Sequence, residues 1–231
     1  MIDVRWLGHS SFEMTLEGGE VILFDPWLEN PKYPAGHTVK RCDAILLSHA
    51  HGDHFGSVAA LVEKFSPKVV CIYELYLYLE GKGIGGSIGM NKGGTLDLGF
   101  ARVTMTNAFH SSSVHENGQI IYAGEPAGFV VEAGGKRVYF AGDTCVFGDM
   151  RLIAEIHGPL DAALLPIGDL YTMGPKEAAY ACRMLRPKTV IPMHWGTFPP
   201  LTGTPAALAA LIGELKGTAV AQIAPGESVR L

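Results

Sequence analysis

The densest group of chemically active side chains is the segment Ser48-His49-Ala50-His51-Gly52-Asp53-His54, which holds three histidines and one aspartate. Neutral imidazoles combined with a carboxylate suit Zn²⁺, and also Mn²⁺, Fe²⁺ or Ni²⁺. One short loop cannot easily direct all four side chains at a single ion. It can direct His49 and His51 toward one metal, and Asp53 with His54 toward a second. Asp53 as the cap of a following helix is the alternative, but the density of histidines favours metal binding.

One loop supplies too few ligands for two ions, so further ligands must come from elsewhere in the chain. His110, Asp143 and His194 each stand at the end of a predicted strand, as the His/Asp loop does. These three residues are therefore the candidates for the remaining ligands. His115, five residues after His110 and in a polar loop, is the alternative to it.

The elements that must position these residues follow from hydrophobic runs and turn residues. Strands are predicted over residues 2–7, 11–16, 20–24, 44–47, 68–72, 101–109, 120–123, 127–132, 137–140, 161–165, 189–191, 218–223 and 227–231. Helices are predicted over residues 56–65, 73–80, 149–157, 175–185 and 204–215. Residues 81–99 contain eight glycines and predict a loop or a set of tight turns.

Length and composition predict one α/β domain over residues 1–231. The hydrophobic content of 48% is ample for a large core. Along the chain, a run of strands is followed by alternating strands and helices, and this order occurs twice. It indicates two similar halves, each with its sheet inside and its helices outside. No low-complexity linker separates the halves, so we expect a single domain.

Net charge and the cysteines indicate which classes of partner to expect and in which cellular compartment the protein works. The formal net charge is −5, with no block of lysine or arginine, so a nucleic-acid partner is not expected. The four cysteines form no CxxC pair and are expected to be reduced, mostly buried thiols. Cys145 is among those expected in the core. No apolar run reaches the ~18 residues of a membrane span, and the N-terminus has no cationic start. We therefore expect a cytoplasmic protein with a small-molecule substrate; whether it forms a homo-oligomer stays open.

The pattern His49-x-His51-x-Asp53-His54 followed by His110, Asp143 and His194 resembles the dinuclear hydrolases of the metallo-β-lactamase superfamily. The chain looks most like the small metal-dependent hydrolases related to L-ascorbate-6-phosphate lactonase. The segments that carry this closer likeness are Leu7-Gly8-His9-Ser10, Asp25-Pro26-Trp27, Pro126-Ala127-Gly128-Phe129, Ala141-Gly142-Asp143-Thr144, Leu165-Pro166-Ile167-Gly168 and Pro192-Met193-His194-Trp195-Gly196-Thr197-Phe198. They extend over nearly the whole chain.

The resemblance implies a four-layer αβ/βα sandwich with two divalent metal ions, Zn²⁺ first, at one edge between the sheets. It assigns His49, His51 and His110 to the first ion. It assigns Asp53, His54 and His194 to the second, with Asp143 bridging both. His51 stands where oxygen-reducing diiron relatives carry a glutamate, which favours hydrolysis.

The expected reaction is metal-dependent hydrolysis of a lactone, ester or phosphodiester by a bridging hydroxide. Two metal ions lower the pKa of a shared water to roughly 7 and polarise the oxygen under attack. Asp53 orients the hydroxide as well as binding metal. His9, in a turn after the first strand, is predicted to protonate a leaving group or contact substrate. Asp25 is predicted to support a ligand histidine, since such ligands usually donate their second N–H to a carboxylate or carbonyl.

Further residues at strand ends and in loops are candidates for the cleft. Asp169 and Tyr171 are predicted to line it, and Lys92 to meet an anionic substrate. For each of them a polar or solvated loop residue is the alternative.

Three other functions share parts of this pattern. A nuclease of the tRNA-processing type would carry basic surface and RNA-binding segments, which are not evident here. A mononuclear iron enzyme of the persulfide-oxidising kind would hold one iron per chain. A non-catalytic metal-binding protein is disfavoured by the complete set of seven candidate ligands, because a structural zinc is normally closed by four.

Overall fold

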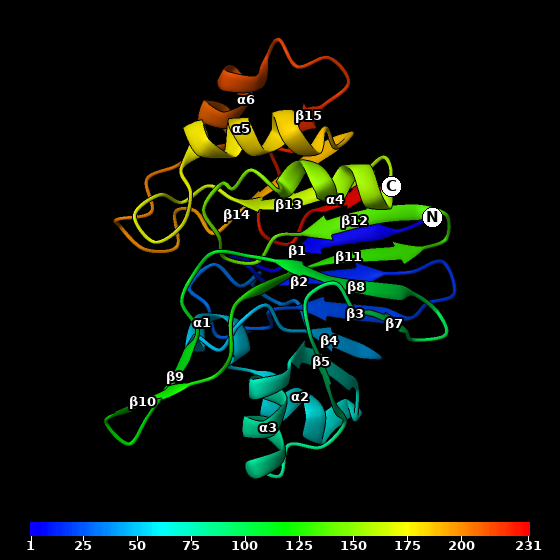
Figure 1. Ribbon diagram of the computed structural model, residues 1–231, viewed down its shortest axis with the longest axis vertical. Helices are drawn as coiled ribbons and strands as arrows, with labels where there is room; N and C mark the ends of the chain where they lie inside the picture. Colours follow the sequence, from blue (N-terminus) through cyan, green and yellow to red (C-terminus); the bar gives the residue numbers. More distant parts are fainter.

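The computed structural model describes residues 1–231 and shows two seven-stranded sheets packed face to face (Figure 1). The first sheet has the order β16 (Ser228–Arg230), β1 (Asp3–Trp6), β2 (Phe12–Thr15), β3 (Val21–Phe24), β4 (Ala44–Leu46), β5 (Lys68–Ile72) and β6 (Ser87–Met90). The second has the order β15 (Ala219–Val220), β14 (Thr189–Met193), β13 (Ala162–Pro166), β12 (Lys136–Phe140), β11 (Ala127–Ala133), β8 (Arg102–Asn107) and β7 (Thr95–Asp97).

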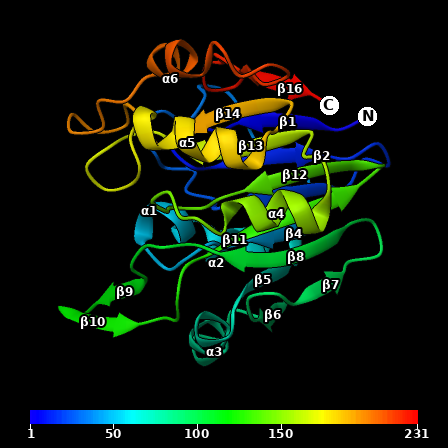
Figure 2. The same cartoon turned by 45° about the horizontal axis from the view of Figure 1, so that its top comes forward.

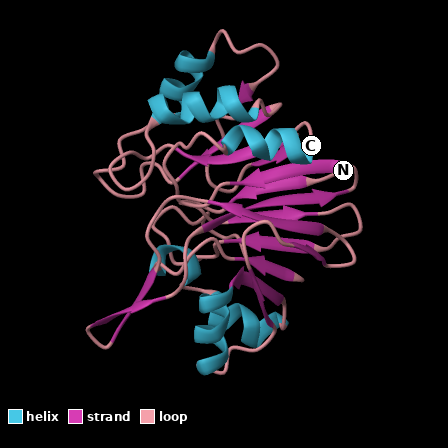
Figure 3. Ribbon diagram, viewed as in Figure 1, coloured by secondary structure: helices cyan, strands magenta, loops and turns pink.

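Helices cover the outer face of each sheet (Figure 3). The helices beside the first sheet are α2 (Val58–Phe65) and α3 (Tyr73–Gly81), and those beside the second are α4 (Met150–His157), α5 (Pro175–Leu185) and α6 (Pro205–Ile212). The short helix α1 (Gly52–Phe55) lies at the sheet edge, within the predicted His/Asp loop. The predicted four-layer α/β sandwich is confirmed.

The core lies mainly between the sheets and consists of 42 buried hydrophobic residues. Phe24 of β3 contacts Phe140 of β12 across this interface, with ring centroids 4.9 Å apart. In β1 the apolar Val4 and Trp6 are buried while their neighbours are half-buried, so the period of two in the sequence selects the inner face. A second cluster of 18 buried residues fills the space between the second sheet and its helices.

Strand direction explains why the predicted site residues converge. In the first sheet β3 runs parallel to β4, and β1 has the same direction because β2 is antiparallel to both β1 and β3. In the second sheet β12, β13 and β14 are parallel, and β8 shares their direction through two antiparallel pairings with β11. The carboxyl ends of these strands therefore meet at one edge of the sandwich.

The prediction of a loop or a set of tight turns over residues 81–99 is wrong, because β6 and β7 form there. Gly89 in β6 lies against helix α3, where an added Cβ would stand 2.9 Å from Cδ1 of Tyr76. Glycine permits this close packing, so it marks a covered strand here.

Strand β9 (Ser113–Glu116) was not predicted; with β10 (Gln119–Tyr122) it forms a hairpin that projects from the body of the molecule (Figure 2). None of the helices is both long enough and apolar enough to span a bilayer.

Candidate metal centre

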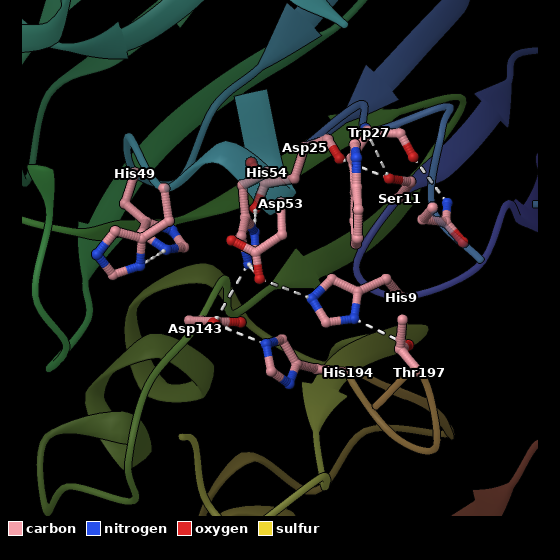
Figure 4. A network of polar contacts seen from close by, with 12 residues as sticks. His9, Ser11, Asp25, Trp27, His49, Asp53, His54, Asp143, His194 and Thr197 are labelled. Carbon is pink, nitrogen blue, oxygen red and sulfur yellow. Dashed lines mark hydrogen bonds and ion pairs between the residues drawn. The ribbon is translucent and has the colours of Figure 1, made fainter. Parts of the chain in front are cut away.

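The predicted ligand residues all lie where strands of the two sheets end. Figure 4 shows His49, Asp53, His54, Asp143 and His194 among them. The first sheet brings His9 after β1, Asp25 after β3 and the His/Asp loop after β4. The second sheet brings His110 after β8, Asp143 after β12 and His194 after β14. The site is thus built from both halves of the sandwich.

Backbone strain is concentrated at this edge. His9, Asp25 and His194 have φ angles of 50°, 40° and 54°. A non-glycine residue in this left-handed region costs of order 1–3 kcal/mol and persists only where its surroundings over-determine it. Asp25 and His194 come directly after β3 and β14, and His9 comes three residues after β1, so the chain turns sharply to place these side chains.

The first group of ligands is His49, His51 and His110, whose nitrogens lie within 4.8 Å of one another. Nε2 of His49 and Nδ1 of His51 are 3.0 Å apart. Two imidazole nitrogens that face each other at this distance must share a proton or bind the same cation. Burial lowers the pKa of all three histidines, most strongly that of His49. They are therefore neutral at neutral pH, the form that binds metal.

The second group contains Asp53, His54 and His194, and it also includes His9. Burial alone would raise the pKa of Asp53, but His9 and His54 outweigh it and hold that carboxyl below its usual range. Asp53 is therefore ionised, and its side chain is 31% exposed. It is a charged side chain open to the pocket and a candidate metal ligand.

Asp143 lies between the two groups. Its Oδ2 atom is 3.1 Å from Nε2 of His194, 3.3 Å from Nε2 of His54 and 3.6 Å from Nε2 of His110. Burial opposes ionisation, yet His194 and His54 lower the pKa of Asp143 well below its usual value. The carboxylate is thus positioned to contact both ligand groups.

The chemistry of this donor set fits bound metal ions. Oδ1 of Asp143, Nε2 of His54 and Nδ1 of His194 are buried and lack hydrogen-bond partners. Such unpaired polar atoms are costly and are rare in native structures. Oδ1 belongs to the carboxylate of Asp143, and Nε2 of His54 faces that carboxylate. A cation between them would satisfy both.

Asp25 supports His54 as predicted. Its Oδ2 atom lies 2.7 Å from Nδ1 of His54, and Ser48 donates its backbone N–H and its hydroxyl to the same carboxylate. Full burial raises the pKa of Asp25, with His54 and Ser48 opposing it. Burial would lower the pKa of His54, but Asp143 and Asp25 together raise it well above its usual value. This pairing directs Nε2 of His54 toward Asp143.

His9 is fully buried and hydrogen-bonded at both ring nitrogens. Its Nε2 atom lies 3.1 Å from Oδ2 of Asp53, and its Nδ1 atom lies 2.9 Å from Oγ1 of Thr197. Burial lowers the pKa of His9 to about 4, against the effect of Asp53. The neutral ring donates Nε2–H to the carboxylate and accepts the Thr197 hydroxyl at Nδ1. The predicted contact of His9 with substrate stays a prediction, and the structure adds a contact with Asp53.

A cavity of about 300 Å³ opens over this cluster. It is lined by His51, Asp53, His110, Ser111, Asp143, Tyr171, His194 and Phe198. Tyr171 is therefore where the sequence predicted it. The sequence did not assign a role to Ser111 or Thr197, because each is a single hydroxyl in a loop; only the nearby His110 and His194 mark these segments.

Several predicted candidates lie outside this cavity. Asp169 does not line it, and Lys92 is bound to Asn107 and Glu125 at 2.7 and 2.9 Å. His115 is exposed on β9, which leaves His110 as the histidine of the cluster. The prediction that Cys145 lies in the core is wrong: its side chain is exposed, in a loop where its backbone N–H donates to the carbonyl oxygen of Phe109.

The chain is similar in sequence to known proteins. A family model described as "Beta-lactamase superfamily domain" matches residues 20–195. The chain belongs to this superfamily. Within the beta-lactamase superfamily it is 49% identical over 231 residues to a UPF0173 metal-dependent hydrolase of Solibacter usitatus, covering 99% of this chain and 100% of the relative. A UPF0173 metal-dependent hydrolase of Methanosarcina mazei is 40% identical over 231 residues, covering 100% and 99%.

A solved structure extends this likeness to three dimensions. Igni18, a metallo hydrolase from the archaeon Ignicoccus hospitalis, superposes with a TM-score of 0.87 at 33% identity. The match covers 99% of this chain and 97% of that one. The identities of 49% and 40% over nearly the whole of both chains show that this protein is a member of the UPF0173 metal-dependent hydrolases.

Proposed function

We propose that this chain is a dinuclear metallohydrolase acting on a small-molecule lactone, ester or phosphodiester. The observation that carries the proposal is the position of Asp143. Its carboxylate lies beside His110 of the first ligand group and beside His54 and His194 of the second. A carboxylate shared in this way joins two ligand sets into one centre.

The proposed ligands divide between the sheets. The first ion is assigned to His49, His51 and His110, the second to Asp53, His54 and His194, with Asp143 shared. Zn²⁺ is the expected metal, and Mn²⁺, Fe²⁺ or Ni²⁺ suit the same nitrogen and oxygen ligands. When bound, such ions lower the pKa of a shared water to roughly 7 and polarise the substrate oxygen.

Asp53 is assigned two tasks, metal binding and orientation of the attacking water. Its Oδ2 atom accepts the hydrogen bond from His9, which orients the carboxylate. The partial exposure of Asp53 to the cavity leaves it accessible to a water molecule. His9 is then a positioning residue, held in turn by Thr197. The names of the relatives, which are metal-dependent hydrolases, support the reaction class.

Metal analysis combined with a substrate panel tests this proposal. Elemental analysis of the purified protein should find two divalent ions per chain. The loaded protein should hydrolyse at least one class among lactones, carboxylic esters and phosphodiesters, and an Asp53→Asn variant should lose this activity. A single iron per chain without hydrolysis would favour the mononuclear iron alternative. Two bound ions with no hydrolysis of any class would contradict the proposed reaction.

A further inference from the structure

The walls of the cavity over the metal centre are aromatic where they are not metal ligands. Apart from the five proposed ligands, only Ser111, Tyr171 and Phe198 line it. Tyr171 is 56% exposed and Phe198 is 36% exposed, so both rings are available to a substrate. The protein therefore offers a bound molecule two aromatic rings and one aliphatic hydroxyl beyond the metal centre.

Phe198 is held in place by its neighbours. Its ring stacks against Trp27 with centroids 6.1 Å apart and an interplanar angle of 29°. It also meets the imidazole of His9 edge-on at 5.8 Å. A ring fixed in this way forms a preorganised apolar wall, so a substrate does not have to order it on binding.

No lysine or arginine lines the cavity. Lys32 lies over the indole of Trp195, with Nζ 4.3 Å from the ring centroid, and is absent from the lining. Lys92 is paired with Glu125 and lines a different cavity. A charged group on the substrate, away from the bond that is broken, would lose its water without gaining a protein cation. Burying a charge without a partner is unfavourable.

From this arrangement we infer that the substrate carries no charged group away from the bond that is broken, and that it presents an apolar chain or ring to Phe198 and Tyr171, as a neutral ester or lactone does. The inference rests on the proposed hydrolase function and narrows it. Substrates with a separate phosphate or carboxylate group, away from the bond that is broken, are disfavoured. An apolar group gains free energy in proportion to the area it buries against the aromatic rings.

A matched pair of substrates tests the inference. 4-Nitrophenyl hexanoate and mono-4-nitrophenyl adipate have similar shapes, but the second ends in a carboxylate. We expect kcat/KM for the hexanoate to exceed that for the adipate by roughly tenfold or more, the usual size of pocket discrimination. Phe198→Ala should lower kcat/KM for the hexanoate much more than for 4-nitrophenyl acetate, and Phe198→Leu should retain most of it. Tyr180→Ala, an exposed ring on α5, is the control and should change neither.

A binding measurement separates this inference from the proposed reaction. Chelator-treated protein is mixed with hexanamide or with adipamate, and binding is followed by saturation-transfer NMR. We expect transfer to hexanamide in the wild type and in Tyr180→Ala, and its loss in Phe198→Ala and for adipamate.

The outcomes distinguish the two hypotheses. Ester hydrolysis with equal or greater activity on the adipate overturns the neutral-substrate inference and leaves the hydrolase function standing. Absence of any hydrolysis, with hexanamide binding that depends on Phe198, refutes the hydrolase function and supports the apolar subsite. Absence of both hydrolysis and hexanamide binding overturns both.

Discussion

Oδ2 of Asp25 lies 2.7 Å from Nδ1 of His54, and neither side chain is exposed to solvent. Asp25 follows β3 and His54 lies in α1, so the contact ties the His/Asp loop to the neighbouring strand. The carboxylate fixes the orientation of the imidazole, because Nδ1–H must point to it. Nε2 is then free to bind a metal ion.

Asp25→Asn should weaken metal binding without dismantling the fold. Loss of a carboxylate behind a ligand histidine typically costs roughly 10- to 100-fold in metal affinity or activity. Chelator competition with the purified variant measures the change. Asp169→Asn is the matched control, since this exposed aspartate lies outside the cavity. Equal metal affinity in Asp25→Asn and wild type would show that Asp25 does not support the centre.

Asp143→Ala should lose most bound metal and all hydrolysis, because its carboxylate is the ligand proposed to be shared by both ions. Elemental analysis gives the metal content per chain, and the same preparation gives the activity. Asp149→Ala, an exposed residue before α4 with no side-chain cap bond, should retain both. Full activity of Asp143→Ala would refute the dinuclear assignment.

Thr197→Val should reduce activity through His9. The substitution removes the hydroxyl that donates to Nδ1 of His9 and leaves a buried acceptor unpaired, at a cost of about 1–3 kcal/mol. We expect lower kcat with little change in KM, and a lower free energy of unfolding in urea. Thr197→Ser restores the hydroxyl and should recover both quantities. A serine variant as impaired as the valine variant would show that the threonine methyl group matters instead.

Gly142→Ala should destabilise the protein more than Gly135→Ala. Both glycines have positive φ, 61° and 73°, so each alanine incurs a backbone cost of about 1–2 kcal/mol. Only at Gly142 would the new Cβ meet another residue, 2.5 Å from Cβ of Ser48. Overpacking adds about 1–3 kcal/mol there and should displace Asp143. Urea unfolding of both variants, with their metal content, measures the difference; equal losses would contradict a tight contact at Gly142.

Asp161 should contribute stability that disappears in acid. Burial would raise its pKa, but Lys188 at 2.9 Å, the backbone N–H of Arg137 and Lys136 outweigh burial and lower it. A carboxyl with a lowered folded-state pKa stabilises fully above its unfolded pKa of about 3.9 and loses this contribution as the pH falls through the folded value. The gap in unfolding free energy between wild type and Asp161→Asn should therefore be constant above about pH 5 and shrink below it. A gap in unfolding free energy that grows toward low pH would contradict a lowered pKa of Asp161.

The sequence allowed much of the metal cluster to be predicted, because its residues have unusual types at recognisable places. His194 comes directly after β14, and His110 and Asp143 come three residues after β8 and β12; parallel strands bring their carboxyl ends together. The supporting role of Asp25 follows from the same logic. These are local signals combined with one rule of sheet geometry.

The support of Phe198 in the cavity wall and three of the strands, β6, β7 and β9, could not be predicted in this way. Phe198 lines the cavity because Trp27, far away in sequence, supports its ring. Gly89 lies in a strand because helix α3 packs onto it, although a glycine-rich run by itself indicates turns. The positions of Phe198 and Gly89 depend on contacts with residues distant in sequence, and such contacts produce no hydrophobic periodicity in the segments that contain these two residues.

The division of the ligands between the two sheets also sets an order of events in time. A chain made from its N-terminus presents His49 to His54 first, then His110, then Asp143, and His194 last. A metal ion captured early would find only part of its coordination sphere, and the sphere closes only when β14 has docked beside β13. Because ions that bind only the native state stabilise it by mass action, their contribution appears at the final step of assembly. Metal retention is therefore a readout of whether both sheets have joined.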